Sequence, residues 1–407
     1  MIYYLYKDIN DEFFFFSYTF QTEAETYVSA SIILWSFSMS EAISLYIHIP
    51  FCKSKCPYCD FYSTKASESD YDKYTSVLID KINFWSKKTD KEVSTVYFGG
   101  GTPSVLGADR LCSVLSEIIN QFSICKTAEI TVEVNPDTGK ILDFVKLYKC
   151  GFNRISIGLQ SAVEKEIKTL GRIHSPEDAR HTVNRARAAG FKNISLDLMM
   201  GIPYQTKESL KNSIDFCNNC GVTHISSYIL KIEEKTKFYQ IKDSLVLPDD
   251  DEQAELYLFA VDYLNTLGYK QYEISNFAKT GFESRHNCNY WKCSEYIGIG
   301  PSAHSFYEGK RFYYGRNSEE FTENKIIYDG TGGNEEEFVM LSLRIRNGLC
   351  FNEFKRRYNK SLPSALISKS ELYAKNGYME VYPDRIAFTP KGFLVSNTII
   401  SDLLNYI

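Results

Sequence analysis

The sequence predicts an α/β protein with a parallel sheet of six strands, either open or curled into a full or partial barrel, and a smaller C-terminal domain. Two observations support this fold class. Short β-branched segments alternate with amphipathic segments, and nearly every β-branched segment ends in polar or glycine-rich residues. Strands joined by helical crossovers run parallel, and parallel barrels carry their functional groups at the carboxyl ends of the strands.

The predicted strands are six short segments that are rich in β-branched and aromatic side chains. They cover residues 44–51, 93–100, 129–136, 154–161, 194–203 and 224–230. Between them, apolar residues recur every three or four positions, which predicts amphipathic helices. The clearest examples are Tyr71, Tyr74, Leu78, Ile82 and Trp85 in one stretch and Leu256, Phe259, Tyr263 and Leu267 in a later one.

The alternating pattern stops near residue 275, and the tail has a different order of elements. Helices are predicted around 338–345, 351–358 and 364–376, followed by a hairpin that turns at Pro383–Asp384. This order resembles a winged-helix domain, but its Lys and Arg residues form no dense stripe, so we expect a packing or lid domain rather than DNA binding. The predicted regions are an extension (1–40), the barrel (41–275), a loop-rich segment (276–330) and the winged-helix-like tail (331–407).

The composition is that of an ordinary soluble protein. Of the 407 residues, 44% are hydrophobic and 24% are charged, and the net charge of −5 provides no general attraction to nucleic acid or to an anionic membrane. No apolar run reaches the ~18–20 residues that span a bilayer. The cysteine count of eleven is odd, and some cysteines are closely spaced. This favours a reducing cytoplasm and metal chemistry over a disulfide framework.

The first 40 residues mix aromatic clusters with acids and contain no basic segment or small-residue cleavage site, which argues against a secretory signal. Met39 lies just before the first predicted strand. We therefore expect that residues 1–38 come from a start codon assigned too early, and a dispensable extension is the alternative.

Three cysteines, Cys52, Cys56 and Cys59, form a CxxxCxxC loop directly after the first predicted strand. Pro50 and Pro57 stiffen this short loop, so the three sulfurs can converge. Zinc would require a fourth ligand, such as Asp60 or a distant histidine. A 4Fe-4S cluster held by three thiolates keeps one iron open for a small chelating cofactor, and S-adenosylmethionine fits that need. The spacing therefore predicts a radical S-adenosylmethionine (SAM) cluster.

The GGGTP stretch at 99–103 follows the second predicted strand. Glycines expose backbone carbonyls to a ligand ammonium group at a distance that a side chain would block. A phosphate-binding loop is disfavoured because no Lys-Ser/Thr pair follows, and a bare structural turn is the other alternative. Several further cysteines have no second metal-binding pair nearby and are interpreted as semi-buried helix residues: Cys112, Cys125, Cys150, Cys217 and Cys220.

Together the motifs resemble the oxygen-independent coproporphyrinogen III dehydrogenase-like family of the radical SAM superfamily. They are, in order, LYIHIPFCKSKCPYCDFYS, YFGGGTPS, EVNPD, GFNRISIGLQS, DLMMGIP, RHNCNYW and GIGPSAHS. The resemblance extends from residue 44 to the C-terminus. It implies a partial parallel (β/α)6 barrel of the radical SAM type and a bound SAM.

The resemblance also implies roles for individual residues. The expected SAM contacts are Tyr46, Tyr58, Gly100, Gly101, Thr102 and Glu133, and residues of a second cofactor site in the family match Gln160, Arg172 and Asp197. Each has a structural alternative. Tyr46 is also a plausible core aromatic, Glu133 a plausible sheet-edge acid, and the last three are plausible hydrogen-bond partners that cap the barrel.

Two features separate the branches of this family. The decarboxylating enzymes have a further cysteine two residues after the third, where this chain has Phe61. The segment HNCNYW (286–291) resembles the HNxxYW signature of the haem-chaperone (HemW-type) branch. The resemblance suggests His286 as a haem ligand and Tyr290 and Trp291 as flat apolar faces for the porphyrin.

In the same segment, Arg285 and Lys292 are candidate partners for haem propionates. A histidine and aromatic pair that plugs the barrel mouth is the structural alternative for the motif. His304 and Cys288 are less favoured iron ligands.

The sequence therefore predicts a cytoplasmic haem chaperone with a 4Fe-4S cluster, SAM and haem. The implied partners are an electron donor for the cluster and haem-accepting proteins, with respiratory-chain haem proteins as a family-level expectation. The alternative is oxidative decarboxylation of coproporphyrinogen III. RNA modification is disfavoured because no basic RNA-binding region is present.

Overall fold

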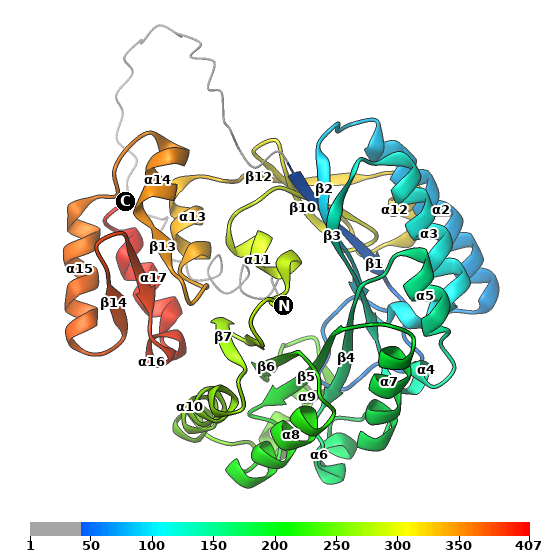
Figure 1. Ribbon diagram of the computed structural model, residues 1–407, viewed down its shortest axis with the longest axis horizontal. Coiled ribbons are helices and arrows are strands. Elements are labelled where there is room, and N and C mark those ends of the chain that lie inside the picture. Colours follow the sequence, from blue (N-terminus) through cyan, green and yellow to red (C-terminus); the bar gives the residue numbers. More distant parts are fainter. Residues whose placement is uncertain (1–41) are drawn as a thin grey trace, which may run out of the picture.

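The computed structural model describes residues 42–407 (Figure 1). The predicted extension and the interpretation of Met39 lie outside these residues. A sheet of six parallel strands, each followed by helices on its outer face, forms the main body of the protein. The C-terminal tail, orange to red in Figure 1, lies beside the open side of this body.

All six predicted strands are confirmed, and they pair in parallel in sequence order. Their bounds are β1 Ala42–Ile49, β2 Glu92–Gly100, β3 Ile124–Val134, β4 Arg154–Gln160, β5 Asn193–Met200 and β6 His224–Ile229. The helical segments between and after them are α2 Glu68–Ser86, η1 Pro103–Leu106, α3 Gly107–Gln121, α4 Pro136–Gly139, α5 Phe144–Cys150, α6 Glu164–Thr169, α7 Pro176–Ala188, α8 Lys207–Asn219, α9 Lys237–Gln240, η2 Lys242–Ser244 and α10 Asp250–Thr266.

The strands alternate between apolar side chains packed in the core and polar side chains that face the inside of the curved sheet. In β1, Leu45 and Ile47 are fully buried in the core, whereas Tyr46 and His48 line an interior cavity. Because successive side chains of a strand point to opposite faces, the same alternation recurs from strand to strand. The helices thus cover an apolar outer face, and the concave face remains polar.

The prediction of a loop-rich segment at 276–330 is wrong in one respect, because this segment adds strands to the sheet. β9 Tyr296–Ile299 pairs parallel to β1, and β10 His304–Tyr307, β11 Lys310–Tyr314 and β12 Ile326–Thr331 continue antiparallel. On the other edge, β8 Asn276–Ala278 pairs with β6, and β7 Lys270–Glu273 pairs with β8. These strands have three to six residues, too few for a clear alternating pattern.

The complete sheet has twelve strands in the order β12-β11-β10-β9-β1-β2-β3-β4-β5-β6-β8-β7. Within the described residues the two ends of this order do not pair, so the sheet is curved and not a closed barrel. The same segment also contains the helices α11 Arg285–Trp291 and α12 Ser318–Thr322.

The tail confirms the three predicted helices and the hairpin. It contains α13 Glu335–Ser342, β13 Leu349–Cys350, α14 Phe351–Tyr358, α15 Ser364–Lys375, β14 Met379–Val381, β15 Arg385–Phe388, α16 Pro390–Leu394 and α17 Ser396–Leu404. The last two helices were not predicted. Backbone hydrogen bonds join the tail to β7 and its turn: the Ile274 N–H donates to Arg344 O at 3.1 Å, and the Arg346 N–H donates to Tyr272 O at 2.9 Å.

The cysteines outside the CxxxCxxC loop differ partly from expectation. Cys112 on α3 and Cys150 at the end of α5 form a disulfide, although both were predicted as separate thiols. The two cysteines are 38 positions apart, and the chain between them returns to the same side of the sheet, a proximity that spacing does not reveal. Cys125 lies on β3 and not on a helix, whereas Cys217 and Cys220 are buried free thiols at the end of α8, as predicted.

Among the helices that the structure describes, none combines the length and the apolar character needed to cross a membrane.

Candidate functional site

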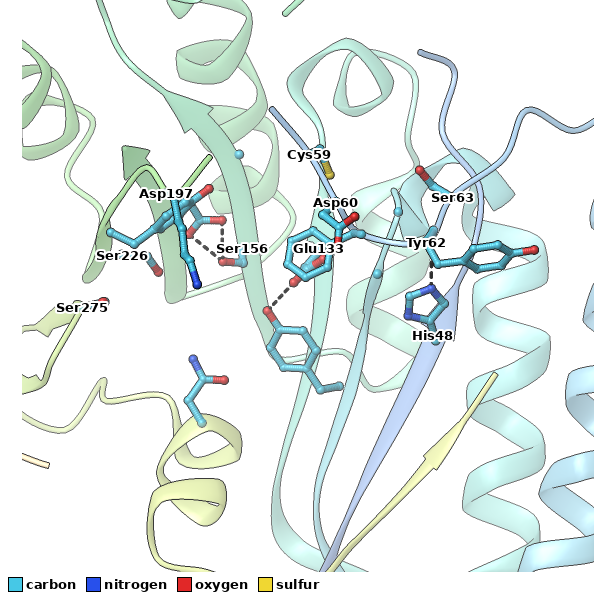
Figure 2. Close-up of a pocket in the computed structure, with 18 of the residues that line it drawn as sticks. His48, Cys59, Asp60, Tyr62, Ser63, Glu133, Ser156, Asp197, Ser226 and Ser275 are labelled. Atoms are coloured by element: carbon cyan, nitrogen blue, oxygen red, sulfur yellow. Dashed lines mark hydrogen bonds between the residues drawn. The ribbon is translucent and has the colours of Figure 1, made fainter. Parts of the chain in front are cut away.

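The concave face of the sheet encloses a cavity of about 820 Å³. The cysteine loop follows the carboxyl end of β1, whereas Asn289 of the HNCNYW segment donates to Ser44 near the start of β1, so the two segments lie toward opposite ends of the cavity. Figure 2 shows Asp197 and Ser226 on one side of the cavity and His48 and Tyr62 on the other, with Cys59, Asp60 and Glu133 between them in this view. The cavity extends to Phe393 and Leu394 of the tail, so the sheet and the tail both contribute to its walls.

The cysteine loop is held in place by backbone hydrogen bonds. Thr64 accepts from the Cys52 N–H at 3.0 Å and donates to Pro50 O at 2.8 Å, which closes the loop at its base. The Cys59 N–H donates to Cys56 O at 3.1 Å and forms a tight turn between two of the predicted ligands. All three cysteines line the cavity.

Polar side chains lie next to two of the three sulfurs. Arg172 Nη1 donates to Cys56 Sγ at 3.6 Å, and Cys52 Sγ lies 3.4 Å from Thr102 Oγ1. Burial raises the pKa of Cys59 to about 11, so its thiolate needs a positive partner such as iron to form at neutral pH.

In residues 42–407 no group of three or more His, Cys, Asp or Glu side chains is arranged around a single metal ion. The three cysteines facing one cavity fit a cluster in which each thiolate binds a different iron.

The glycine motif packs directly against the strand that leads into the cysteine loop. Gly100 has φ +112°, and a Cβ atom there would lie 2.6 Å from the His48 ring. The Gly101 N–H donates to Ile49 O at 2.8 Å, and a Cβ at Gly101 would lie 2.6 Å from Phe51 O. Close backbone approach explains these two glycines, and their contact with SAM stays a prediction.

Glu133 is half-buried in the cavity wall. Its Oε1 accepts a hydrogen bond of 2.7 Å from the Tyr97 hydroxyl, drawn as a dashed line in Figure 2. Burial raises the pKa of this carboxyl to about 7. The predicted cofactor residue Tyr46 lies beside it on β1, and its hydroxyl is 3.0 Å from His48 Nδ1.

The three residues assigned to a second cofactor site line the same cavity but also have partners in the wall. Arg172 Nη2 donates to Asn135 Oδ1 at 2.9 Å and to Gly158 O at 2.8 Å. Gln160 accepts from the Tyr228 hydroxyl at 3.1 Å, and Asp197 accepts from the Ser156 hydroxyl at 3.0 Å. They are thus preorganised by wall contacts, and their role toward a cofactor stays a prediction. Tyr58, the remaining aromatic of the cysteine loop, packs against Phe238 with ring centroids 6.1 Å apart.

The HNCNYW segment forms α11, which lies at the floor of the cavity. His286 is 1% exposed, and both of its ring nitrogens have partners. Nδ1 is 2.7 Å from Thr95 Oγ1, and Nε2 is 2.9 Å from the Tyr290 hydroxyl. Iron binding by His286 stays a prediction, and it would require the loss of one of these contacts. Trp291 is also buried, in agreement with the alternative that the motif plugs the sheet.

The two cations next to the motif are not brought into the cavity. Arg285 donates to the carbonyl of Thr127, and neither Arg285 nor Lys292 is among the lining residues. Both are therefore poorly placed for propionates in this cavity. Cys288 is also absent from the lining, and burial raises the pKa of its thiol to about 12.

His304, the less favoured candidate, lies in the cavity wall and is only partly buried. Its ring stacks on Tyr313 with centroids 4.8 Å apart. Burial, aided by the positive charges of Arg311 and Arg316, lowers the pKa of His304 to about 4. The imidazole is therefore neutral at pH 7, which is the form that binds iron.

Several cavity residues were not identified from the sequence: His48, Tyr97, Arg154, Ser156 and Ser226. Arg154, at the start of β4, is only 2% exposed and lies near the charges of Glu129 and Asp197. These residues could have been found from the alternation of side chains within each strand. In β4, every second residue faces the cavity: Arg154, Ser156, Gly158 and Gln160.

Comparison with known proteins agrees with this geometry. Residues 46–217 match the model of the radical SAM superfamily, and residues 336–395 match the HemN C-terminal domain. The chain is 34% identical over 384 residues to the Heme chaperone HemW of Bacillus subtilis (strain 168), which covers 89% of this chain and 99% of that protein. It is 40% identical over 264 residues to the Heme chaperone HemW of Escherichia coli (strain K12), covering 64% of this chain and 69% of that protein.

Among solved structures, the chain resembles the coproporphyrinogen III oxidase HemN from Escherichia coli, a radical SAM enzyme. The TM-score is 0.75 with 21% identity, over 90% of this chain and 91% of the other, so this likeness shows a shared fold. The full-length match to the chaperones is closer in sequence than the match to the oxidase. The chain, which combines the curved sheet and its three-cysteine loop with the HNxxYW helix and the HemN-type tail, thus belongs to the HemW family of radical SAM proteins.

Proposed function

We propose that this protein is a cytoplasmic haem chaperone that holds a 4Fe-4S cluster and SAM and delivers haem to acceptor proteins. The observation that carries the proposal is one cavity that joins the three-cysteine loop to a wall of histidine and aromatic side chains. The near full-length similarity to proteins named Heme chaperone HemW supports the choice of haem as the cargo. Haem proteins of the respiratory chain are the proposed acceptors, and a separate electron donor serves the cluster.

The size and lining of the cavity suit a large flat ligand. About 820 Å³ lies within the ~300–1,000 Å³ range of small-molecule sites. Tyr290, Tyr296, Tyr313 and Tyr314 line it together with Arg311 and Arg316. Aromatic faces can pack on a porphyrin, and guanidinium groups can pair with its carboxylates.

The proposed cluster ligands are Cys52, Cys56 and Cys59, and the cluster with SAM would supply one-electron chemistry when bound. On the protein side, Arg172 donates to the Cys56 sulfur and fixes its orientation. Glu133, Gly100, Gly101, Thr102, Tyr46 and Tyr58 are the proposed SAM contacts, with Gln160, Arg172 and Asp197 adjacent.

For the iron ligand, we propose His304 ahead of His286. His304 lies in the cavity wall, is half-buried and has a neutral imidazole, whereas His286 is 1% exposed beneath Thr95 and Tyr290. Tyr290 and Trp291 would then support the floor of the haem site.

The experiment is a haem titration of anaerobically purified, cluster-loaded protein. We expect a stoichiometric shift of the Soret band that is altered in His304→Ala and retained in His286→Ala. His181→Ala is the matched control, because no cavity contact involves that histidine. A wild-type protein with no stoichiometric shift would contradict the proposal.

Oxidative decarboxylation of coproporphyrinogen III is the second candidate, favoured only by the shared fold with HemN. Phe61 stands where the decarboxylating enzymes have a further cysteine, and its side chain is 41% exposed. Anaerobic assay of the reduced protein with this substrate distinguishes the two functions. Turnover to protoporphyrinogen would establish the enzyme instead of the chaperone.

A further inference from the structure

His286, the histidine of the HNCNYW segment, lies directly against Tyr97, a cavity residue that contacts the predicted SAM residue Glu133. Its ring stacks on that of Tyr97, with centroids 4.9 Å apart and an interplanar angle of 25°. Tyr97 lies on β2, and its hydroxyl donates to Glu133 Oε1 at 2.7 Å. Two contacts therefore lead from α11 to the carboxyl that is proposed to bind SAM.

The His286 ring is itself held on both edges. Thr95 Oγ1 lies 2.7 Å from Nδ1, and the Tyr290 hydroxyl lies 2.9 Å from Nε2. Thr95 in turn donates to Ser44 Oγ at 2.9 Å, and Asn289 Nδ2 donates to the same oxygen at 2.9 Å. Since Thr95 is on β2 and Ser44 on β1, the histidine and asparagine of the motif attach α11 to two neighbouring strands.

The start of α11 is fixed by a third strand. Glu129 on β3 accepts the N–H groups of Arg285 at 3.1 Å and His286 at 3.0 Å. A carboxylate that accepts the first N–H groups of a helix satisfies donors that have no partner within the helix. The position of the His286 ring is thus determined by β1, β2 and β3 together.

The Tyr97 ring has little room to move away from this stack. A Cβ at Gly99 would lie 2.9 Å from Tyr97 Cε1 and 3.2 Å from Glu133 Oε1, so this glycine leaves space for both groups. Tyr97 is also within 6.3 Å of Tyr46, centroid to centroid. Loss of the His286 ring would open a void on the face of Tyr97 that this ring covers, and would release the Tyr97 hydroxyl from Glu133.

We infer that His286 is a positioning residue, which orients Tyr97 so that its hydroxyl holds the Glu133 carboxyl in the SAM site. The motif histidine therefore acts on the cofactor site through Tyr97 and not as the iron ligand. The inference rests on the proposed function only where it assigns SAM to Glu133. The geometry of the Tyr97–Glu133 contact does not depend on haem.

The test measures SAM affinity in cluster-loaded protein without haem, by calorimetry, for single and double variants. We expect about tenfold weaker SAM binding in His286→Ala and in Tyr97→Phe, the scale of one lost hydrogen bond to a charged group. The double variant should be no weaker than either single variant, because both remove the same contact. Additive losses would overturn the route through Tyr97.

Two further variants separate positioning from loss of folding and from iron binding. His286→Phe keeps a flat ring against Tyr97, and we expect it to keep SAM affinity within about threefold and the haem Soret band unchanged. His224→Ala is the matched control: His224 is equally buried, its ring nitrogens contact Ser195 and Tyr272, and it does not line the cavity. It should leave SAM affinity unchanged. An altered Soret band in His286→Phe with normal SAM binding would overturn the inference.

A readout without ligand distinguishes failure of this inference from failure of the proposed function. Infrared spectroscopy of protein with labelled glutamate carboxyls reports the hydrogen bond at Glu133 in the absence of SAM and haem. The Glu133 band should shift alike in Tyr97→Phe and His286→Ala. If the wild type binds no SAM but the bands shift, the positioning holds and the cofactor assignment fails. If His286→Ala leaves the band unchanged, the positioning itself is wrong.

Discussion

The two ends of the cavity are built by different means. At the cysteine end, three ligands come from one loop of eight residues, Cys52–Cys59, and two backbone bonds to Thr64 close it. At the floor, His286 is held by Thr95, Tyr290 and Glu129, which come from three different elements. The side chains of the cysteine end thus face the cavity, whereas the polar groups of the floor are hydrogen-bonded to one another. A single motif histidine is therefore weaker evidence of a ligand than a closely spaced set of thiols.

The largest expected effect is a loss of bound iron, which distinguishes the cysteine end of the cavity from its floor. In Cys56→Ala the proposed cluster would lose one of its three ligands, so we expect loss of nearly all bound iron and of the cluster absorption, with the fold retained. Iron content per chain and circular dichroism measure the two quantities. Cys125→Ala, a change at a free cysteine outside the cavity, is the control and should load normally. Full iron loading in Cys56→Ala would mean that the loop is not the cluster site.

A substitution at the floor of the cavity should instead lower the free energy of unfolding and leave the iron content unchanged. Glu129→Ala leaves the N–H groups of Arg285 and His286 without their acceptor, which costs about 2–4 kcal/mol for two groups. Urea unfolding measures the loss. Glu164→Ala, an exposed first-turn glutamate paired only with Lys168, should change stability by less than about 0.5 kcal/mol. If Glu129→Ala were as stable as the wild type, the floor would not depend on this contact.

Glu133, between the two ends, predicts a pH dependence. Its pKa is raised from 4.5 to about 7 by burial, so between these pH values the folded protein holds a proton that the unfolded chain has released. Stability therefore falls as the pH rises from 4.5 to 7 and levels off above 7, by up to about 3 kcal/mol for this group. The comparison of Glu133→Gln with the wild type by urea unfolding at pH 5 and pH 7.5 isolates the contribution. Equal pH slopes in the two proteins would refute it.

The smallest effect is expected at the edge of the cysteine loop. Phe61 is 41% exposed, so Phe61→Ala should change stability by no more than about 0.5–1 kcal/mol and leave cluster iron unchanged. Phe51→Ala is the contrasting change nearby, because Phe51 is buried against Tyr71 and Tyr74, and it should cost about 3–5 kcal/mol. Loss of the cluster in Phe61→Ala would show that this side chain supports the loop after all.

Features that depend on near neighbours in the chain could be predicted from the sequence. The six parallel strands, the three helices and hairpin of the tail and the family membership all follow from patterns within a few residues of each other. The three cysteines belong to this group as well, because a loop of eight residues brings its own side chains together whatever the rest of the fold does.

Features that depend on the return of distant segments required the tertiary structure. Strands β9–β12 are too short to be stable alone, and they form because β1 offers them an open edge. Cys112 and Cys150 meet because α3 and α5 pack on the same face. His286 resembles a ligand in HNCNYW, but Thr95 and Glu129, more than 150 positions earlier in the chain, occupy its ring and its N–H. Sequence alone therefore determined which chemistry the chain carries, and packing of remote strands determined which of its polar groups still face the cavity, because a buried polar group binds whichever partner the fold places beside it.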